Sequence, residues 1–418
     1  MNRYLTPSEH LMWLLGCDRP INVSLCATIR GELSVNQLRE ALDWVQRRHP
    51  ILGVRIVTNE QQQPQFVSEG VPGIPVQVIE RQGEEHWCEA LCTELLRPFS
   101  WSEEPLARIV LLHSPNVSEL IVTYHHIGDG LSGAYLMRDI WCEMTQPGSY
   151  RSPLPEIPPI DQLMPLVARD GEKDSPDLDG EIGADATTFL KEDGIQGKLH
   201  LLHWYFSPEE TDRLVARCRQ EQTTVQGAFC ASFLLEMAAE VSLSEETVLK
   251  CHSPFNLRNY LAPPVGENFG EYVARVLTSH LLNKGTQFWD LARDVKHQIN
   301  QAIVDKKIFS GGSKAKSFLS TNPNTMTVRQ YGKDMVSSDI TVTNLGRLDI
   351  PLQRGGLELE KLFFTVTGLR YEPIIVGITT IGGTMCVTFR YLDSLTPSAS
   401  AQRINQGAIE RLRVALTG

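Results

Sequence analysis

The residues best suited to chemistry lie in one short segment, where the adjacent His125 and His126 are followed by Asp129 and Gly130. The residues before them favour a buried β-strand, and those after them carry apolar side chains at helical spacing. A histidine at the end of a strand is held by rigid backbone, and imidazole exchanges its proton near neutral pH, so this pair supplies a candidate general base. Gly130 permits a tight turn, and its backbone N–H at the start of the next helix can face a developing oxyanion.

The same segment also fits a purely structural turn between a strand and a helix. In that interpretation the histidine satisfies its own hydrogen bonds and Asp129 caps the helix. A metal site is not predicted here, because the side chains of neighbouring residues in an extended chain point to opposite sides. Nor do Cys230, Cys251 and His252 have the spacing of zinc ligands.

Composition restricts the class of protein. The chain has 418 residues, of which 42% are hydrophobic and 21% charged, so it is long enough for two substantial cores. Its formal net charge of −11 argues against a nucleic acid or an anionic membrane as partner. The nine cysteines are scattered, the first twenty residues lack a secretory pattern, and no apolar run is long enough for a membrane span. We therefore expect a cytoplasmic protein.

The chain divides into two parts of similar composition. Residues 151–190 are rich in proline and acidic side chains and poor in large apolar ones, which is typical of a linker or surface loop. They separate a first lobe, residues 1–150, from a second lobe, residues 191–418, and both have ordinary domain sizes. Strand patterns and helix patterns alternate in each lobe, so the expected fold class is α/β with mixed α+β sheets.

The sequence around the histidine pair resembles the His-x-x-x-Asp-Gly core of a known superfamily. That superfamily contains condensation domains, polyketide-associated (Pap-type) acyltransferases and chloramphenicol acetyltransferase. Other segments are similar to the same superfamily in the same chain order, among them YLTPSEHLMW, GELSVNQLREALDWVQRRHPILGVRI, SPFNLRNYL and VTNLGRLDIP. The resemblance therefore extends over nearly the whole chain.

The spacing of this motif selects one histidine of the pair. Three residues separate His125 from Asp129, as in the superfamily, whereas only two separate His126 from Asp129. The resemblance implies that His125 is the catalytic base and that Tyr124 takes the place of the first histidine of peptide-condensation domains. His126 is a candidate substrate-binding residue, and the two roles exchange if the loop is shifted.

The resemblance also implies which residues support the base. Asp129 is expected to point away from the substrate and to pair with Arg258 of the second lobe. Thr343 and Asn344, in the segment TVTNLGR, are candidates to line the site and to contact the acyl carbonyl. An ordinary turn, in which asparagine and Gly346 supply left-handed geometry, explains the same segment equally well.

The fold implied by the resemblance is a pseudo-dimer of two chloramphenicol-acetyltransferase-like lobes, with the site in a tunnel at their interface. The implied reaction transfers an acyl group to an alcohol from a thioester, carried either by CoA or by the phosphopantetheine arm of a carrier protein. No tightly bound cofactor or metal is required, and a monomer suffices. Two alternatives stay open: an amide-forming condensation enzyme, and a catalytically silent homologue that binds carrier proteins or lipids.

Overall fold

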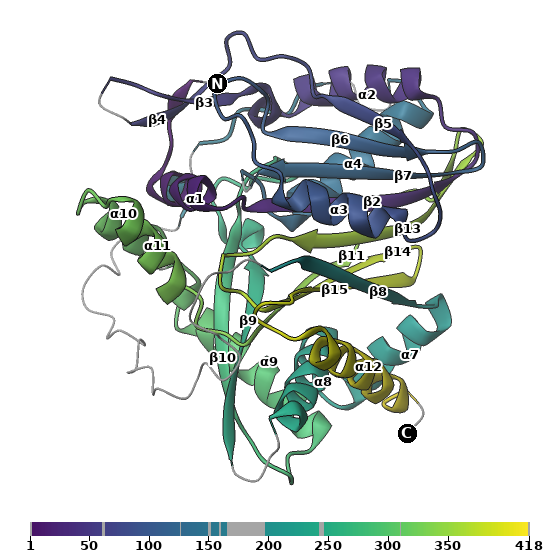
Figure 1. Ribbon diagram of the computed structural model, residues 1–418, viewed down its shortest axis with the longest axis vertical. Coiled ribbons are helices and arrows are strands. Elements are labelled where there is room, and N and C mark those ends of the chain that lie inside the picture. The colour runs from purple at the N-terminus through teal and green to yellow at the C-terminus, as the bar shows by residue number, and fades with distance from the viewer. Residues whose placement is uncertain are drawn as a thin grey trace.

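The computed structural model describes residues 2–60, 63–125, 127–148, 152–158, 160–164, 197–241, 246–309 and 311–416. The strands in these residues form two six-stranded sheets and one three-stranded sheet. Figure 1 shows the two large sheets side by side, each covered by helices. The mixed α/β class expected from the sequence is confirmed.

The first large sheet carries the histidine segment on a central strand, β7. In order across the sheet, the strands are β12 (Gln353–Arg354), β13 (Leu357–Val366), β2 (Asn22–Arg30), β7 (Val117–His125), β6 (Ala107–His113) and β5 (Val76–Glu80). Strand β7 ends at His125, which lies opposite Asn22 of the antiparallel β2. Helices α3 (His86–Leu96) and α4 (Gly130–Thr145) pack against this sheet, and α2 (Val35–Arg48) packs against α4.

The alternation of side chains along β2 explains why both faces of this sheet are covered. Leu25 and Ala27 join a buried cluster with apolar residues of α2 and α4. Cys26, which points the other way, joins a different cluster with residues of α3. A period of two with apolar residues on both sides is what a central strand between two helical layers requires.

The second large sheet lies below the first in Figure 1. Its strands, in order, are β10 (Val273–Leu282), β9 (Thr247–Asn256), β11 (Ile340–Arg347), β14 (Ile374–Ile381), β15 (Thr384–Leu392) and β8 (Leu199–Phe206). The helices on its outer side are α7 (Pro208–Gln220), α8 (Val225–Glu240), α9 (Phe288–Val304) and α12 (Ser398–Val414). Apolar residues of α8 and α12 share one buried cluster with the central strands of this sheet.

Strand β13 joins the two lobes. It comes from the second half of the sequence but pairs antiparallel with β2 in the first sheet. It also contacts the second sheet, where Thr388 Oγ1 donates to the Phe364 carbonyl oxygen at 2.6 Å. A Cβ at Gly377 would lie 2.1 Å from the same oxygen, so only glycine permits this approach. A division of the chain at residues 151–190 therefore leaves the first sheet incomplete, and of that expected linker only residues 152–158 and 160–164 are described.

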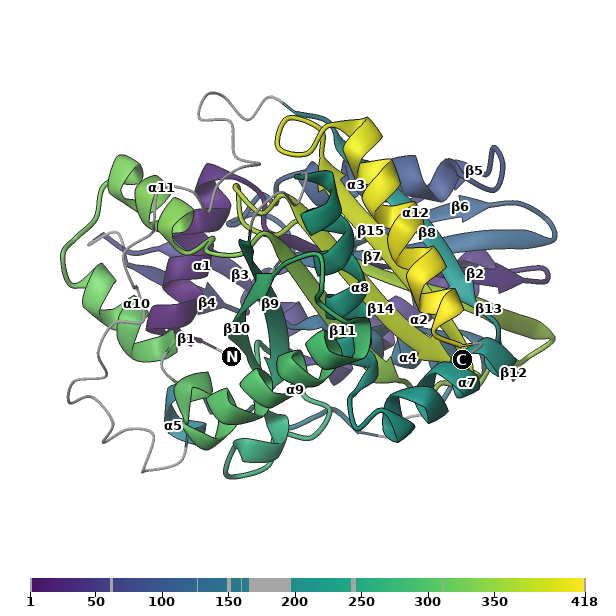
Figure 2. The ribbon, with the colours of Figure 1, turned by 90° about the horizontal axis from the view of Figure 1, so that it is seen from below.

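Helix α1 (Pro7–Asp18) forms a second connection between the lobes. It begins at Thr6, which caps the helix together with Glu9. Figure 2 shows it beside α10 (Gly311–Leu319) and α11 (Thr325–Asp334), which come from the second half of the chain. The remaining elements are α5 (Ile160–Leu163), three short 3₁₀ turns, and the small sheet of β1 (Arg3–Tyr4), β4 (Pro64–Val67) and β3 (Arg55–Thr58).

None of the helices in the described residues is both long and apolar enough to cross a bilayer.

Candidate active site

The imidazole of His125 is enclosed between two segments of the first lobe. Its side chain is 2% exposed, and both ring nitrogens are buried. The ring of Trp101 meets the imidazole edge-on, with 4.4 Å between ring centroids. On another side lies α1, where a Cβ at Gly16 would come within 2.9 Å of His125 Nε2. A substrate must displace one of these neighbours to reach the base, so the open tunnel expected from the resemblance stays a prediction.

Asp129 caps α4 and at the same time binds the second lobe. Its Oδ1 accepts hydrogen bonds from the backbone N–H and the hydroxyl of Ser132, both at 2.8 Å. Arg258 donates to the two carboxylate oxygens at 2.5 and 3.0 Å, and the Tyr272 N–H donates to Oδ2 at 3.1 Å. Both charged side chains are 6% exposed. The ion pair predicted from the sequence is therefore present, buried and bidentate.

The second lobe also fixes the backbone of the motif. The carbonyl of Gly270 accepts a hydrogen bond from the Asp129 N–H at 3.1 Å, and the Gly270 N–H donates to Ser132 Oγ at 3.0 Å. A Cβ at Gly128 would lie 2.2 Å from the ring of Phe269. Glycine is needed at residue 128 because this ring packs directly on the backbone.

Tyr124 holds the loop from the inside of the first lobe. Its hydroxyl donates to the Asp129 carbonyl at 2.7 Å, and its ring meets that of Phe269 edge-on with centroids 4.9 Å apart. The side chain is fully buried, and burial raises the pKa of the phenol well above its usual value, so it remains a neutral donor. The position of the first histidine in peptide-condensation domains thus holds a structural tyrosine here.

Gly130 lies at the first position of α4, against the end of β11. A Cβ there would come within 2.6 Å of Leu345 Cδ2. Thr343 is 7% exposed, while Asn344 Oδ1 accepts the Gly346 N–H at 2.8 Å and Gly346 has a φ of +74°. Asn344 lies within β11, where the pairing with β14 shifts register between Asn344 and Arg347. Its contact with an acyl carbonyl stays a prediction, as does the oxyanion role of Gly130.

Two family models match the chain, one in each half. The condensation-domain model matches residues 17–150, and the model described as phthiocerol/phthiodiolone dimycocerosyl transferase C-terminus matches residues 196–369. The first half of the chain is therefore similar to condensation domains, and the second half is similar to a dimycocerosyl transferase. A curated relative, the phthiocerol/phthiodiolone dimycocerosyl transferase of Mycobacterium leprae, is 26% identical over 262 residues, which span 58% of this chain and 60% of the relative.

Several solved structures share the fold over nearly the whole chain. Polyketide synthase associated protein 5 from Mycobacterium tuberculosis has a TM-score of 0.67 at 18% identity, and the match covers 98% of both chains. Trichothecene 15-O-acetyltransferase from Fusarium sporotrichioides has a TM-score of 0.72 at 12% identity, covering 99% of this chain and 95% of that one. The two chloramphenicol-acetyltransferase-like lobes expected from the sequence are confirmed.

A second buried ion cluster joins the lobes farther along α4. Asp139 accepts hydrogen bonds from His49 Nε2 at 2.9 Å and from Arg48 Nε at 2.7 Å. Arg138 pairs with Asp139 and also donates to both oxygens of Glu267 in the second lobe at 2.6 Å. Burial raises the pKa of Asp139, but the His49 hydrogen bond and the Arg138 charge outweigh it and lower the pKa to about 2. The carboxylate is therefore ionised throughout the neutral range.

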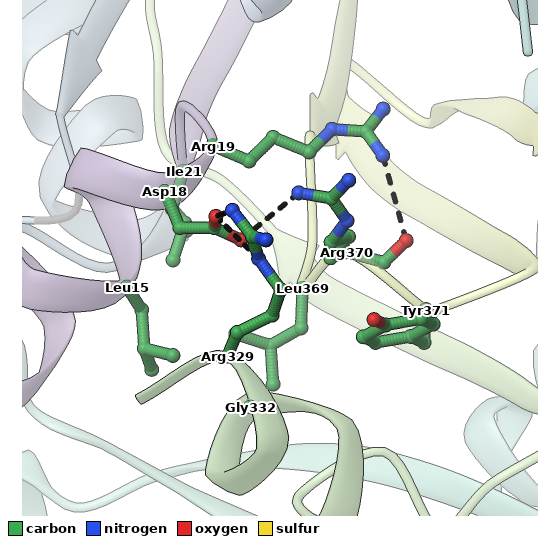
Figure 3. Close-up of a pocket in the computed structure, with 9 residues that line it drawn as sticks. All are labelled: Leu15, Asp18, Arg19, Ile21, Arg329, Gly332, Leu369, Arg370 and Tyr371. Atoms are coloured by element: carbon green, nitrogen blue, oxygen red, sulfur yellow. Dashed lines mark hydrogen bonds and ion pairs between the residues drawn. The ribbon is translucent and has the colours of Figure 1, made fainter. Parts of the chain in front are cut away.

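A small pocket lies on α1, beside the turn that contains Gly16. It is lined by Leu15, Asp18, Arg19, Ile21, Arg329, Gly332, Leu369, Arg370 and Tyr371. Figure 3 shows the guanidinium groups of Arg329 and Arg370 directed at the Asp18 carboxylate, whereas that of Arg19 is directed at the Arg370 carbonyl. Arg329 Nε and Arg370 Nη1 donate to Asp18 at 2.8 and 3.0 Å, and Arg19 Nη1 donates to the Arg370 carbonyl at 3.4 Å. Three arginines against one aspartate leave a local excess of positive charge in an otherwise acidic chain.

Several residues of the site were missed by sequence reasoning, and His126 lies outside the described residues. Ser132 had a usable signal, because the third residue after a helix-capping Asp is the usual hydrogen-bond partner. Gly16 and Trp101 had none, since each reaches His125 only through the tertiary fold.

Proposed function

We propose that this protein transfers an acyl group from a thioester to an alcohol in lipid or polyketide metabolism, with His125 as the general base. The observation that carries the proposal is the position of His125, which ends a central strand beside a loop fixed by the Asp129–Arg258 pair. The names of similar proteins support this class of reaction, since one is a dimycocerosyl transferase and another a 15-O-acetyltransferase.

The proposed reaction needs no acyl-enzyme. His125 removes the hydroxyl proton as the alcohol oxygen forms a bond to the thioester carbonyl carbon, and a tetrahedral intermediate results. When the intermediate collapses, the C–S bond breaks, and the imidazolium returns the proton to the leaving thiolate. Holding both substrates in one water-excluded site further increases the rate of acyl transfer. The Gly130 N–H is the candidate donor to the oxyanion.

Product analysis tests this proposal against its alternatives. Thiol release is measured with acyl-CoA and acyl-phosphopantetheine donors in the presence of a long-chain alcohol or the matching amine. We expect thiol release with the alcohol, together with an ester of the corresponding mass. Preferential amide formation would instead identify an amide-forming condensation enzyme. Donor binding without thiol release under any condition would identify a silent homologue.

Gly16→Ala is expected to lower kcat/KM at least tenfold while the protein stays folded. Gly16 lies inside α1, where alanine is more favourable than glycine by up to about 1 kcal/mol. Its methyl group would lie 2.9 Å from His125 Nε2, so it covers the base or displaces it. Thiol-release kinetics and the thermal midpoint are measured on the same preparation. Gly53→Ala is the control, because a Cβ at Gly53 meets no atom within 4 Å. Unchanged kcat/KM in the Gly16 variant would contradict the enclosed geometry.

The arginine-lined pocket favours a thioester donor that carries a phosphate, as CoA and phosphopantetheine both do. Arg19→Gln is therefore expected to raise KM for acyl-CoA by about tenfold, the loss expected for one charge-assisted hydrogen bond. KM for an acyl-pantetheine without phosphate should not change. Arg403→Gln is the control, because Arg403 pairs with Glu240 on the outer helices of the second lobe. An equal effect on both donors would rule out phosphate recognition at this pocket.

A further inference from the structure

Three side chains with metal-binding atoms meet where the two lobes touch. Glu85 and Cys88 lie at the start of α3 in the first lobe, and His203 lies on β8 in the second. His203 Nε2 is 3.1 Å from Glu85 Oε2, and Cys88 Sγ is 3.7 Å from the same oxygen. The three ligand atoms all lie within 4.8 Å of one another.

This group is remote from the site at His125. The opposite end of α3 approaches that site, because the Leu95 carbonyl accepts a hydrogen bond from Asn22, which lies opposite His125 in the sheet. Glu85 and Cys88 are at the other end of the helix. The acyltransferase reaction proposed above makes no use of either residue.

We propose that Glu85, Cys88 and His203 bind a zinc ion that joins the two lobes. A thiolate, an imidazole and a carboxylate form a donor set that zinc prefers, with bonds of about 2.0–2.3 Å. In a tetrahedral site, such bonds place neighbouring ligand atoms about 3.3–3.8 Å apart. The two separations that involve Glu85 Oε2, 3.1 and 3.7 Å, are close to this range. Cys88 Sγ and His203 Nε2 lie within 4.8 Å of each other. Three protein ligands leave the fourth position to water.

The local fold already holds these ligands in place. The Cys88 N–H donates to the Glu85 carbonyl at 3.1 Å, so the two residues lie on one turn with their side chains on the same face. The His203 ring is held by Trp87 and Phe363, with ring centroids 4.9 and 5.3 Å away. Cys88 is buried while Glu85 is exposed, so the group is open to solvent on one side.

The charge around Cys88 favours a cation. Burial, followed by the negative charge of Glu85, raises the pKa of the Cys88 thiol. A divalent ion reverses this effect, because it stabilises the thiolate and releases the proton.

Zinc titration of the chelator-treated full-length protein tests the proposal. Binding is measured in competition with a chromophoric chelator, and the thermal midpoint is recorded with and without zinc. We expect one saturable equivalent, a higher midpoint with zinc, and at least tenfold weaker binding in Cys88→Ser and in His203→Asn. Cys92→Ser and His200→Asn are the controls. Cys92 lies one turn farther along α3 than Cys88. His200 is on the same strand as His203, β8, but pairs with Asp393. Both controls should bind zinc normally.

A second readout applies even if the Cys88 variant does not fold. Cobalt added to the wild-type protein should give the charge-transfer absorption of a thiolate ligand, and His203→Asn should weaken it. Absence of this absorption, absence of saturable zinc binding, or zinc binding that is unchanged in His203→Asn would each overturn the proposal. None of these outcomes bears on acyl transfer, so the two proposals can fail separately.

Discussion

His125→Ala is expected to lower kcat for thiol release by about 10²–10⁴-fold, the usual contribution of a positioned general base. KM for the thioester should change little, because the imidazole acts on the acceptor proton and does not bind the donor. The variant should fold, since His125 is one strand-end residue enclosed by Trp101 and α1, both of which remain. Steady-state kinetics at saturating donor, with circular dichroism as the folding check, provide the measurement.

His126→Ala is the matched control for this prediction. His126 is adjacent to the proposed base and has the same side chain, so the comparison separates the role of each position. We expect near-normal kcat in His126→Ala. If instead only this variant loses activity, the motif is shifted by one residue and the general base has been assigned to the wrong histidine. If both variants keep the wild-type kcat, neither histidine is the base.

Arg258→Met is expected to lower the free energy of unfolding by about 3–5 kcal/mol, the usual effect of breaking one side of a buried ion pair. The change leaves the Asp129 carboxylate without its cation in a site that is 6% exposed. The Ser132 and Tyr272 hydrogen bonds to this carboxylate remain, but they do not neutralise its charge. Urea denaturation gives the free energy, and the same samples are assayed for thiol release, because the loop beside His125 depends on this pair.

Two comparisons show whether burial causes the effect. Arg347→Met breaks the Arg347–Asp212 pair, whose side chains are 60% and 71% exposed, and should cost at most about 1 kcal/mol. The double variant D129N/R258M should be more stable than Arg258→Met alone, because it removes the uncompensated charge while asparagine still caps α4. If Arg258→Met lowers the free energy of unfolding by no more than Arg347→Met does, the buried pair does not hold the lobes together.

The sequence predicted the parts of the site that are encoded locally or by a motif. The strand that ends at His125, the helix after Gly130 and the capping role of Asp129 all follow from hydrophobic periodicity and helix-start residues near the motif. The Asp129–Arg258 pair was predicted through the superfamily resemblance, because no rule of spacing links residues so far apart. The Asn-x-Gly segment at Asn344 forms an irregularity inside β11 and not the ordinary turn that its sequence also allowed, although Gly346 does have a positive φ.

Other features depend on which elements meet in three dimensions. The segment around Phe364 reads as a strand, but alternation along a strand does not reveal which sheet it enters. From the sequence alone, Gly16 is a glycine that lowers the stability of a helix. In the structure, the absence of its side chain leaves room for His125 Nε2. Asp139 has the pattern of a surface charge on an amphipathic helix, yet it is fully buried because His49, Arg48 and Arg138 converge on it.

The placement of β13 affects how the protein folds while it is being synthesised. Until residue 366 has been synthesised, β2 lacks one of its two neighbours in the first sheet, β13, and presents an unpaired edge on a mostly apolar strand. At ordinary translation rates of about 5–20 residues per second, roughly 10–40 s pass between the synthesis of residue 150 and that of residue 366. During this interval the nascent first lobe is exposed to aggregation and to chaperones. For the same reason, a gene split in the 151–190 region would yield two polypeptides that complete their folding only together.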